Sequence, residues 1–419
     1  MRNILLKYLE RTGKVAEFNL FLSYFKNIPS LRFAIIKISG ETLEYNIKEI
    51  AEDIAFLWKL KLFPIIIHGA GTHLNRKLSN SKKINDIRVT PKDDIPKIEK
   101  TFSLISNHLE KEIRLCGGRA KVIRNCIFCE YLDKKVYGNV GKVVEINSKK
   151  IEKTIKEGFV PIISPFGISR DKKNKFNINA DSLTSFITSI FKINKIIFIT
   201  QTGGILDSEG SIIPFVNVSD NKPKDFITRG MRFKLKEIKK YLIKNPQVSI
   251  TITSAKNILS ELFTIKGSGT VLKNHIIENS PDEEKVDKTK IVKNIQDSFG
   301  RKLKKDFWDE PIERIFFQKD YEAVAIVKKI NDLPYLCKFS VLKAKQGTGL
   351  GKALWQELTR KYTSFVWRSN SYNPINSFYY SKSDGMTKSG KWHIFWKNIK
   401  KDKIWKIVKI ISEKEESFI

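Results

Sequence analysis

A glycine-rich turn in the last fifth of the chain has the residue types and spacing of a phosphate-binding loop. The apolar run 338–342 predicts a strand, and a turn containing three glycines leads from it into a predicted helix. Glycines let a ligand approach the backbone closely, and the free N–H groups at a helix start attract anions. We therefore expect this turn to bind a pyrophosphate through Gln346, Gly347, Gly349, Gly351 and Lys352.

Different phosphate-binding features occupy the first two thirds of the chain. They follow predicted buried strands, and ligands of open α/β sheets collect outside the carboxyl ends of strands. Glycine turns at these positions present backbone N–H groups that form a concave anion site. The candidate residues are Lys37 at the end of the first strand and Gly40 after it, Gly69, Ala70 and Gly71 after the second, and Thr200 at the end of a later strand with Gly203, Gly204 and Asp207 after it. Asn177 and Asp181 stand at one predicted helix start, and Lys234 stands in the first turns of another.

Two folded regions must position these residues. Short apolar runs alternate with helical patterns up to residue 278, which predicts an α/β sandwich with a mainly parallel sheet. The predicted strands are 33–38, 63–68, 122–128, 160–164, 196–200 and 248–253, and the predicted helices are 47–61, 95–115, 182–191 and 231–243. Residues 1–28 predict an amphipathic N-terminal helix, 279–290 a polar linker, and 291–419 a smaller α+β domain.

Composition excludes several classes of protein. No apolar run approaches the roughly 18 residues of a membrane span. Charged residues interrupt the N-terminal segment as they would not in a signal peptide, and its acidic residues argue against a transit peptide. We therefore expect a cytoplasmic location. The net charge of +32 raises nucleic-acid binding as a non-enzymatic alternative, but the lysines are scattered and no aromatic RNA-binding signature accompanies them. Cys126 and Cys129 form a lone C-x-x-C without the second ligand pair that a zinc site needs, so we predict no metal site in the protein itself.

An ordered set of motifs makes residues 30–275 resemble the amino-acid kinase family, and within it N-acetylglutamate kinase. The motifs are K-I-S-G, H-G-A-G, D-I-R-V-T, N-I-N-A-D, Q-T-G-G-I-L-D, G-M-R-F-K and E-L-F-T-I-K-G-S-G-T. The resemblance implies transfer of the γ-phosphoryl group of ATP, with Mg²⁺, to the γ-carboxylate of N-acetylglutamate. Positioning and charge stabilisation dominate such a reaction.

The same resemblance implies roles for the individual residues. Lys37 stabilises the transferring phosphoryl group, Lys234 stabilises the leaving ADP, and Asp181 holds both lysines. Backbone donors come from the turns at Gly40 and at Gly69, Ala70 and Gly71. Arg88 binds the substrate α-carboxylate, Asn177 contacts the acetylated substrate, and Thr200 to Asp207 lies beside the nucleotide. One residue departs from the family pattern, because Ser39 stands where a second glycine is usual, and this predicts reduced kinase activity.

The C-terminal glycine turn resembles the acetyl-CoA signature of the GCN5-related N-acetyltransferases. Motifs over 298–400 extend this resemblance to the vertebrate-type N-acetylglutamate synthases, which include bifunctional bacterial synthase/kinases. It implies a catalytic Tyr379, with the adjacent Tyr380 as the alternative. Lys338, Arg368 and Asn373 would bind glutamate. Asn370 stands where arginine is frequent, which predicts weaker glutamate binding because a carboxylate loses a bidentate partner.

Together the two resemblances predict a bifunctional enzyme of arginine biosynthesis. It would acetylate L-glutamate with acetyl-CoA and then phosphorylate N-acetyl-L-glutamate with ATP. The alternative keeps only the acetyltransferase, with the kinase-like domain acting as an arginine sensor. The family resemblance also implies an arginine effector site at Glu261 and Gly267, and a homotetramer.

Overall fold

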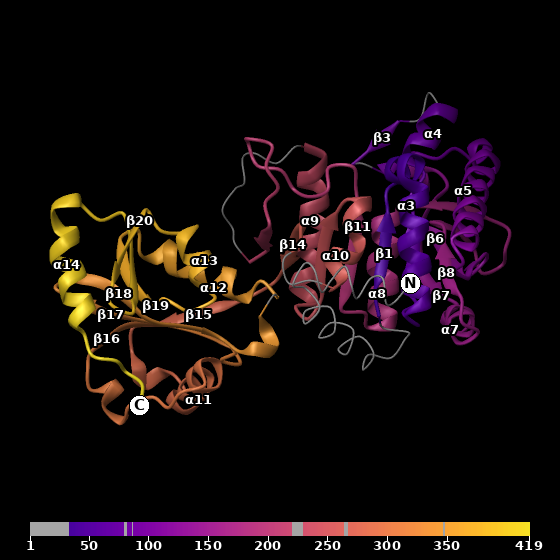
Figure 1. The fold of residues 1–419 in the computed structure, drawn as a ribbon. Coiled ribbons are helices and arrows are strands. Elements are labelled where there is room, and N and C mark those ends of the chain that lie inside the picture. Colours follow the sequence, from indigo (N-terminus) through magenta and orange to yellow (C-terminus); the bar gives the residue numbers. More distant parts are fainter. Residues whose placement is uncertain (1–32, 79–81, 86, 220–228, 264–266, 347) are drawn as a thin grey trace. The chain divides into compact units, whose positions relative to one another are not determined.

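The computed structural model describes residues 33–78, 82–85, 87–219, 229–263, 267–346 and 348–419 (Figure 1). The side chains of 229–234, 236, 237 and 344 lie outside this description. The chain divides into two compact units, with the boundary between Asn274 and His275. The predicted N-terminal helix over 1–28 lies outside the described residues.

The first unit is built on an eight-stranded sheet. All neighbouring strands in it pair in parallel, except that β13 and β14 pair antiparallel. In spatial order the strands are β12 (Phe215–Asn217), β14 (Thr270–Lys273), β13 (Ser249–Thr253), β11 (Lys195–Ile199), β1 (Ile35–Ile38), β2 (Ile65–His68), β8 (Val160–Ile163) and β5 (Ala120–Val122). The central strands β1 and β2 are buried along their whole length. The structure confirms the predicted α/β sandwich with a mainly parallel sheet.

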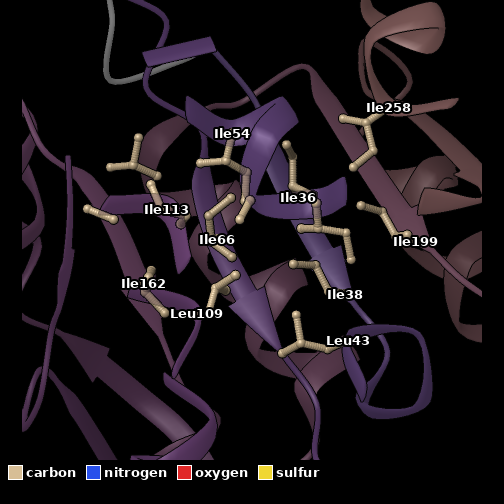
Figure 2. Packing of buried hydrophobic residues seen from close by; sticks show 14 of the residues in the cluster. Ile36, Ile38, Leu43, Ile54, Ile66, Leu109, Ile113, Ile162, Ile199 and Ile258 are labelled. Carbon is tan, nitrogen blue, oxygen red and sulfur yellow. The ribbon is translucent and has the colours of Figure 1, made fainter. Parts of the chain in front are cut away.

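Helices cover both faces of this sheet, and strand alternation decides which side chains each face receives. Ile36 and Ile38 pack with Ile66 against the helices of one face (Figure 2), while Ile35 and Lys37 point to the other face. The first face carries α3 (Gly40–Lys59), α5 (Ile95–Leu115) and α10 (Ile258–Phe263), and the second carries α7 (Ser148–Lys156), α8 (Ala180–Phe191) and α9 (Arg229–Lys244). Each fully buried isoleucine contributes roughly 1.5–3 kcal/mol to this packing.

A four-stranded closed barrel and a short hairpin complete the first unit. The barrel contains β6 (Ile127–Tyr131), β7 (Val140–Ile146), β9 (Phe166–Ile168) and β10 (Lys175–Ile178), with α6 (Lys134–Tyr137) between β6 and β7. The hairpin pairs β3 (Lys83–Ile84) with β4 (Ile87–Arg88), and η2 (Lys92–Asp94) follows it. The predicted single strand 122–128 was wrong, because Asn125 adopts a φ of 53° between β5 and β6. That left-handed residue turns the chain from the large sheet into the barrel.

The second unit is a seven-stranded sheet with helices on both faces. Its strands in spatial order are β15 (Ile277–Ser280), β16 (Ile312–Gln318), β17 (Ala323–Ile330), β18 (Leu333–Val341), β19 (Phe365–Asn370), β21 (Trp392–Lys397) and β20 (Gly385–Ser389). Helices α12 (Leu350–Lys361) and α13 (Asn376–Tyr380) pack on one face, and α11 (Lys288–Phe299) and α14 (Lys401–Glu413) pack on the other. All neighbouring strands are antiparallel except β18 and β19.

The segment 279–290, predicted to be a linker, is folded within the second unit. Strand β15 pairs with β16 from Ile277 to Ser280, and η4 (Glu283–Lys285) and α11 follow. The polar residues that indicated a linker are caps here: Asp282 accepts a hydrogen bond from the backbone N–H of Glu284, and Asp287 accepts one from Lys290. The unit boundary therefore lies before β15.

The structure also describes the state of the cysteine pair and the length and polarity of the helices. Cys126 and Cys129 are free and buried, and burial raises the pKa of the Cys126 thiol to about 11 and that of Cys129 to about 12. Both thiols therefore stay protonated near neutral pH and are poor metal ligands or nucleophiles. Within the described ranges, every helix is too short or too polar to cross a membrane.

Candidate functional site

A lysine–aspartate pair lies at the carboxyl end of the central strand β1. Alternation along β1 directs Lys37 toward α8, and Asp181 stands in the first turn of that helix. The Lys37 Nζ and the Asp181 Oδ1 are 2.7 Å apart, and the side chains are 10% and 31% exposed. Asn179 fixes the helix start by accepting hydrogen bonds from the N–H groups of Asp181 and Ser182. The pair is an ammonium held at a strand end by a carboxylate that remains accessible.

Two glycine turns lie against each other beside this pair. Strands β1 and β2 run in parallel register, with Ile38 opposite His68, so the turns that follow them emerge side by side. A Cβ on Gly40 would stand 2.7 Å from the backbone nitrogen of Gly71 and 2.9 Å from the Cα of Ala70. Only glycine permits so close an approach of two backbones. The N-terminal N–H groups of α3 and α4 (Gly71–Lys77) therefore lie close together, and helix-start N–H groups are the kind that bind anions.

Ser39 has a structural role that the sequence did not reveal. Its φ of −68° and ψ of 149° are ordinary for any residue, so the position does not require glycine. Its side chain caps α3, since Oγ accepts a hydrogen bond from the N–H of Thr42 at 3.1 Å. The conformational reason for expecting reduced kinase activity from Ser39 is therefore removed.

His68 anchors the second glycine turn. It is completely buried, and its Nε2 lies 2.7 Å from Ser106 Oγ on α5. Its Nδ1 lies 3.3 Å from the carbonyl oxygen of Gly69. Burial lowers the pKa of His68 to about 4, so the imidazole is neutral at physiological pH. Neither His68 nor its partner Ser106 was predicted as a site residue from the sequence, although His68 stands within the H-G-A-G motif.

Arg88 and Asn177 come together around Thr90. Asn177 Nδ2 donates to Thr90 Oγ1 at 3.0 Å, and Thr90 Oγ1 donates to the carbonyl oxygen of Arg88 at 3.1 Å. The Arg88 guanidinium contacts the amide oxygen of Asn75, and burial lowers the pKa of Arg88. Thr90 thus links the Asn177 amide to the backbone of Arg88, whose guanidinium is held by Asn75.

The predicted nucleotide segment begins beside the first glycine turn. The N–H of Ser39 donates to the carbonyl oxygen of Ile199, so the turn at Gly40 lies next to Thr200. Gly203 has a φ of 68°, a backbone conformation that favours glycine. Gly204 packs so closely against Ile212 that a side chain would not fit there. Asp207 accepts hydrogen bonds from the N–H groups of Glu209 and Ser211 and thereby shapes its own loop. Lys234 belongs to α9, but its side chain lies outside the described part of the chain.

The residues expected to bind an effector form a tight local contact. Glu261 is 6% exposed, and its Oε1 accepts a hydrogen bond from the N–H of Gly269 at 2.7 Å. A side chain at Gly267 would overlap the Glu261 carboxylate. Glycine is therefore needed at this position to keep the carboxylate where it is.

In the second unit, the predicted pyrophosphate turn leads into α12. Gly349 is the N-cap with a φ of 86°, which leaves the first N–H groups of the helix without a side-chain cap. Gln346 donates to the carbonyl oxygen of Val341 at 3.3 Å, and burial lowers the pKa of Lys352. A side chain at Gly351 would meet Val341 at an ordinary 3.5 Å. Gly347 lies outside the described residues.

Strands β18 and β19 separate beside this turn. They pair only through Tyr335 with Val366 and Leu336 with Trp367, although both strands continue beyond these residues. The backbone groups that lie past the separation are available for an extended ligand that enters from the start of α12.

Tyr379 and Tyr380 have different surroundings. Tyr379 is 5% exposed and packs among Phe339, Trp355 and Trp367, and burial raises its pKa. Its phenol therefore stays protonated at neutral pH and can donate a proton or a hydrogen bond. Tyr380 is 45% exposed, and its hydroxyl lies 3.0 Å from His393 Nδ1. Tyr379 is the residue that lies beside the separated strands.

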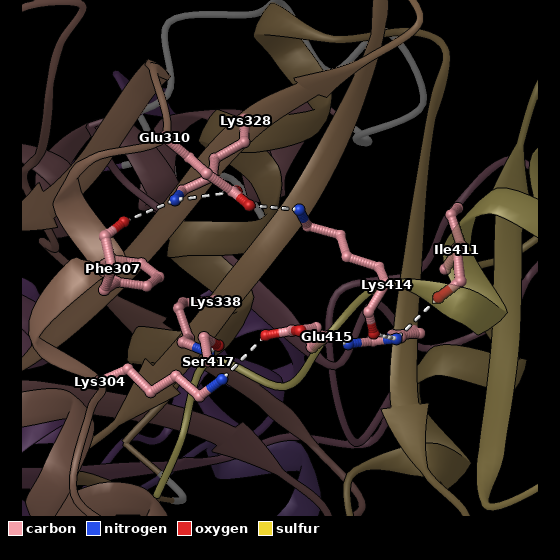
Figure 3. Close-up of polar contacts among 10 residues, drawn as sticks. Lys304, Phe307, Glu310, Lys328, Lys338, Ile411, Lys414, Glu415 and Ser417 are labelled. Atoms are coloured by element: carbon pink, nitrogen blue, oxygen red, sulfur yellow. Dashed lines mark hydrogen bonds and ion pairs between the residues drawn. The ribbon is translucent and has the colours of Figure 1, made fainter.

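The three residues expected to bind glutamate are divided between two regions. Lys338 is 5% exposed and contacts Ser417 Oγ near the C-terminus (Figure 3). Arg368 donates to the carbonyl oxygens of residues 411, 414 and 415. Asn373 shapes the loop before α13, where its Oδ1 accepts a hydrogen bond from the N–H of Ile375. Ser417 was not predicted as a site residue from the sequence, because nothing in its sequence context indicates a contact with β18.

Asn370 also has a local role. Its side-chain oxygen accepts a hydrogen bond from the N–H of Tyr372 at 3.1 Å, and its carbonyl oxygen accepts one from Asn376. The amide therefore shapes the loop in which Asn373 lies. Reduced glutamate binding caused by Asn370 stays a prediction.

Comparisons with known proteins agree with both units. The amino acid kinase family matches residues 32–252, and the NAT domain of N-acetylglutamate synthase (an N-acetyltransferase) matches residues 277–415. An acetylglutamate kinase from Xylella fastidiosa is 32% identical over 395 residues, which cover 91% of this chain and 94% of the relative.

Two solved structures have a similar fold. They are N-acetylglutamate synthase from Neisseria gonorrhoeae complexed with coenzyme A and N-acetyl-glutamate, and the same enzyme complexed with coenzyme A and L-arginine. Their identities are 16% and 15% and their TM-scores are 0.61 and 0.58, and each alignment covers 98% of the solved chain and 91% or 92% of this chain. At these identities the likeness shows the fold alone.

Proposed function

Since the chain belongs to the amino acid kinase family and carries the acetyltransferase domain of N-acetylglutamate synthase, we propose that it catalyses two steps of arginine biosynthesis. It transfers the acetyl group of acetyl-CoA to L-glutamate, and it phosphorylates N-acetyl-L-glutamate with ATP. The observation that carries the kinase assignment is the Lys37–Asp181 pair at 2.7 Å beside the two glycine turns.

The geometry of the first unit suits phosphoryl transfer. Lys37 offers a positive charge to the migrating phosphoryl group, and Asp181 orients that lysine. The N–H groups at Gly40 and at Gly69, Ala70 and Gly71 stabilise negative charge on the phosphate and on the attacking carboxylate. Arg88 and Asn177 hold the substrate, which brings its γ-carboxylate into line. We assign Lys234 to the leaving ADP and residues Thr200, Gly203, Gly204 and Asp207 to the nucleotide.

The residues fit ATP with Mg²⁺ in the chemistry of their donors. Mg²⁺ would neutralise phosphate charge, as it does in other phosphoryl transfers. Backbone N–H groups, two lysines and a partly exposed carboxylate are the groups that such a ligand needs. Asp181 is the carboxylate beside Lys37, and this pairing limits the charge that the site must bury.

The geometry of the second unit suits acetyl transfer. The start of α12 binds the pyrophosphate of coenzyme A through Gln346, Gly347, Gly349, Gly351 and Lys352, and the separated strands receive its pantetheine arm. The neutral amine of glutamate attacks the thioester carbonyl, the C–S bond breaks, the nitrogen releases a proton to solvent as the amide forms, and the thiolate takes up a proton. Tyr379 supplies that proton because its raised pKa keeps it protonated. Lys338 and Asn373 bind glutamate.

Replacing Lys37 with alanine tests the kinase assignment. ADP release with ATP and N-acetylglutamate should fall at least about 100-fold, the usual cost of removing one charge-stabilising donor. Lys121→Ala is the matched control, because Lys121 lies on a strand of the same sheet and pairs with Glu157 at its exposed edge. Equal ADP release by wild type and Lys37→Ala would refute the assignment, whereas unchanged acetyl transfer would show that the second unit is intact.

Three further properties belong to this proposal. We propose that L-arginine acts as an effector through Glu261 and Gly267, and the Neisseria enzyme with L-arginine supports this. Titrating arginine into both assays tests it, and no change at millimolar arginine would exclude regulation. A homotetramer and a cytoplasmic location stay predictions, which sedimentation and fractionation would test.

A further inference from the structure

The last residues of the chain form a strap across one face of the second sheet. The strap comprises residues 414–419, which follow α14. Its backbone pairs with the segment before η5 (Lys305–Trp308), because the N–H of Ile419 donates to Lys302 and the N–H of Lys304 donates to Ser417. The Phe418 ring packs against Phe299 with a centroid distance of 5.0 Å. These contacts fix the strap at a defined position.

Lys338 projects from β18 beneath this strap. It is 5% exposed, and among the described residues the hydroxyl of Ser417 is its hydrogen-bond partner (Figure 3). Its Nζ lies 4.0 Å from the centre of the Phe418 ring. Burial lowers the pKa of Lys338, the neighbouring Cys337 acts to raise it, and the charges of Lys328, Arg368 and Arg301 lower it. A buried ammonium among other cations is unfavourable unless an anion accompanies it.

The carboxylates near the strap are committed to other cations. Glu415 pairs with Lys304 at 3.1 Å, and Glu416 pairs with Arg301 at 2.8 Å and with Lys391. Glu310 pairs with Lys328 at 3.2 Å and with Lys414 at 2.7 Å (Figure 3). In the described part of the chain, Lys338 therefore has a hydroxyl and the aromatic faces of Phe307 and Phe418 as neighbours but no carboxylate paired with it.

Arg368 is engaged differently from Lys338. Its two terminal nitrogens donate to the carbonyl oxygens of Ile411, Lys414 and Glu415, at the C-terminal end of α14 where helix carbonyls lack partners. Its guanidinium also stacks on Trp392, with its carbon 4.2 Å from the ring centre. Arg368 thus anchors the root of the strap, and its role is that of a positioning residue.

We propose that the strap forms one wall of the glutamate site and that Ser417 is a further substrate-binding residue of the acetyltransferase. The Ser417 hydroxyl accepts a hydrogen bond from Lys338 and donates a hydrogen bond to a carboxylate of glutamate. That carboxylate supplies the anion that Lys338 lacks. The inference rests on the proposed function and adds a specificity-determining residue to it, while Arg368 acts through the strap.

Steady-state acetyl transfer by the full-length protein tests this inference. Ser417→Ala should raise the KM for glutamate about 10- to 30-fold, since a hydrogen bond to a charged group is lost. The KM for acetyl-CoA and the kinase activity should not change. Ser417→Thr keeps the hydroxyl and should restore glutamate binding to within about threefold of wild type. Ser412→Ala is the control, because that hydroxyl bonds only the carbonyl of Lys409 within α14 in the described structure.

The outcomes separate the inference from the proposed function. An unchanged KM for glutamate in Ser417→Ala, beside an active wild type, overturns the inference alone. Equal losses in Ser417→Ala and Ser417→Thr, together with a lowered melting temperature, make the strap merely structural and also overturn it. A wild type that acetylates no glutamate refutes the proposed acetyltransferase, and the inference with it.

Discussion

Replacing Gly40 with alanine tests the contact between the two glycine turns of the first unit. Non-bonded heavy atoms prefer a separation of about 3.5 Å, so a Cβ 2.7 Å from the nitrogen of Gly71 would push the turns apart by roughly 0.8 Å. The obstructing atoms are backbone, so no side-chain rotation can relieve the overlap. Overpacking of this kind costs about 1–3 kcal/mol of stability, and a displacement near 1 Å costs roughly 100-fold in rate.

Gly71→Ala is the matched comparison. Among the described residues, no heavy atom lies within 4 Å of a Cβ at this position, so the substitution should leave stability within about 0.5 kcal/mol of wild type. The added methyl group points into open space beside the proposed anion site. We therefore expect lower kinase activity without lower stability, in contrast to Gly40→Ala.

The assay combines urea unfolding with both enzyme activities. Gly40→Ala should unfold its first unit at lower urea and release ADP about 100-fold more slowly. Acetyl transfer should persist in native buffer, because the second unit has its own core. If Gly40→Ala kept both the urea midpoint and the rate of ADP release of wild type, the proposed contact between the turns would be refuted.

Three further predictions follow from single residues. Ser39→Ala should destabilise the first unit by about 0.5–2 kcal/mol through loss of the α3 cap, and Ser39→Gly by only a few tenths; equal urea midpoints for the two variants would contradict this role. His68 is neutral when folded, with a pKa of about 4, but has a pKa near 6.5 when unfolded. Its contribution is therefore complete above pH 6.5 and is lost as the pH falls toward 4, with a slope of up to about 1.4 kcal/mol per pH unit; His68→Gln should flatten the pH dependence of stability in that window. Tyr379→Phe should slow acetyl transfer about 10²- to 10⁴-fold with an unchanged melting temperature, and wild-type rates would exclude it as the proton donor.

Many elements follow from local sequence. The helix 95–115 was predicted with the bounds that the structure has, because its apolar periodicity is regular and Pro96 marks its start. The prediction failed at 122–128, where the apolar run hides a left-handed Asn125. It failed again at 279–290, where charged residues cap helices rather than form a linker. In both places the outcome depends on which sheet the backbone joins.

The candidate sites likewise combine features that local sequence predicts with features that only the fold decides. The motifs placed Lys37 and Asp181 at a strand end and a helix start, and the structure brings them to 2.7 Å. The sequence also raised a doubt about Ser39 that its backbone conformation removes. Neither Ser106 behind His68 nor Ser417 on Lys338 was selected. Serine has little local signature, and only its partner gives it a role.

The sequence by itself determined the chemistry on offer: which turns contain glycine, which strands end in a lysine, and which helices begin with free N–H groups. These are properties of a few neighbouring residues. The tertiary structure alone decided that Gly40 contacts Gly71, and that Ser417 reaches a lysine 79 positions earlier in the chain. Such contacts depend on how strands pair and helices pack over the whole unit. They form where packing outweighs the loss of chain entropy, and no short segment of sequence determines that outcome.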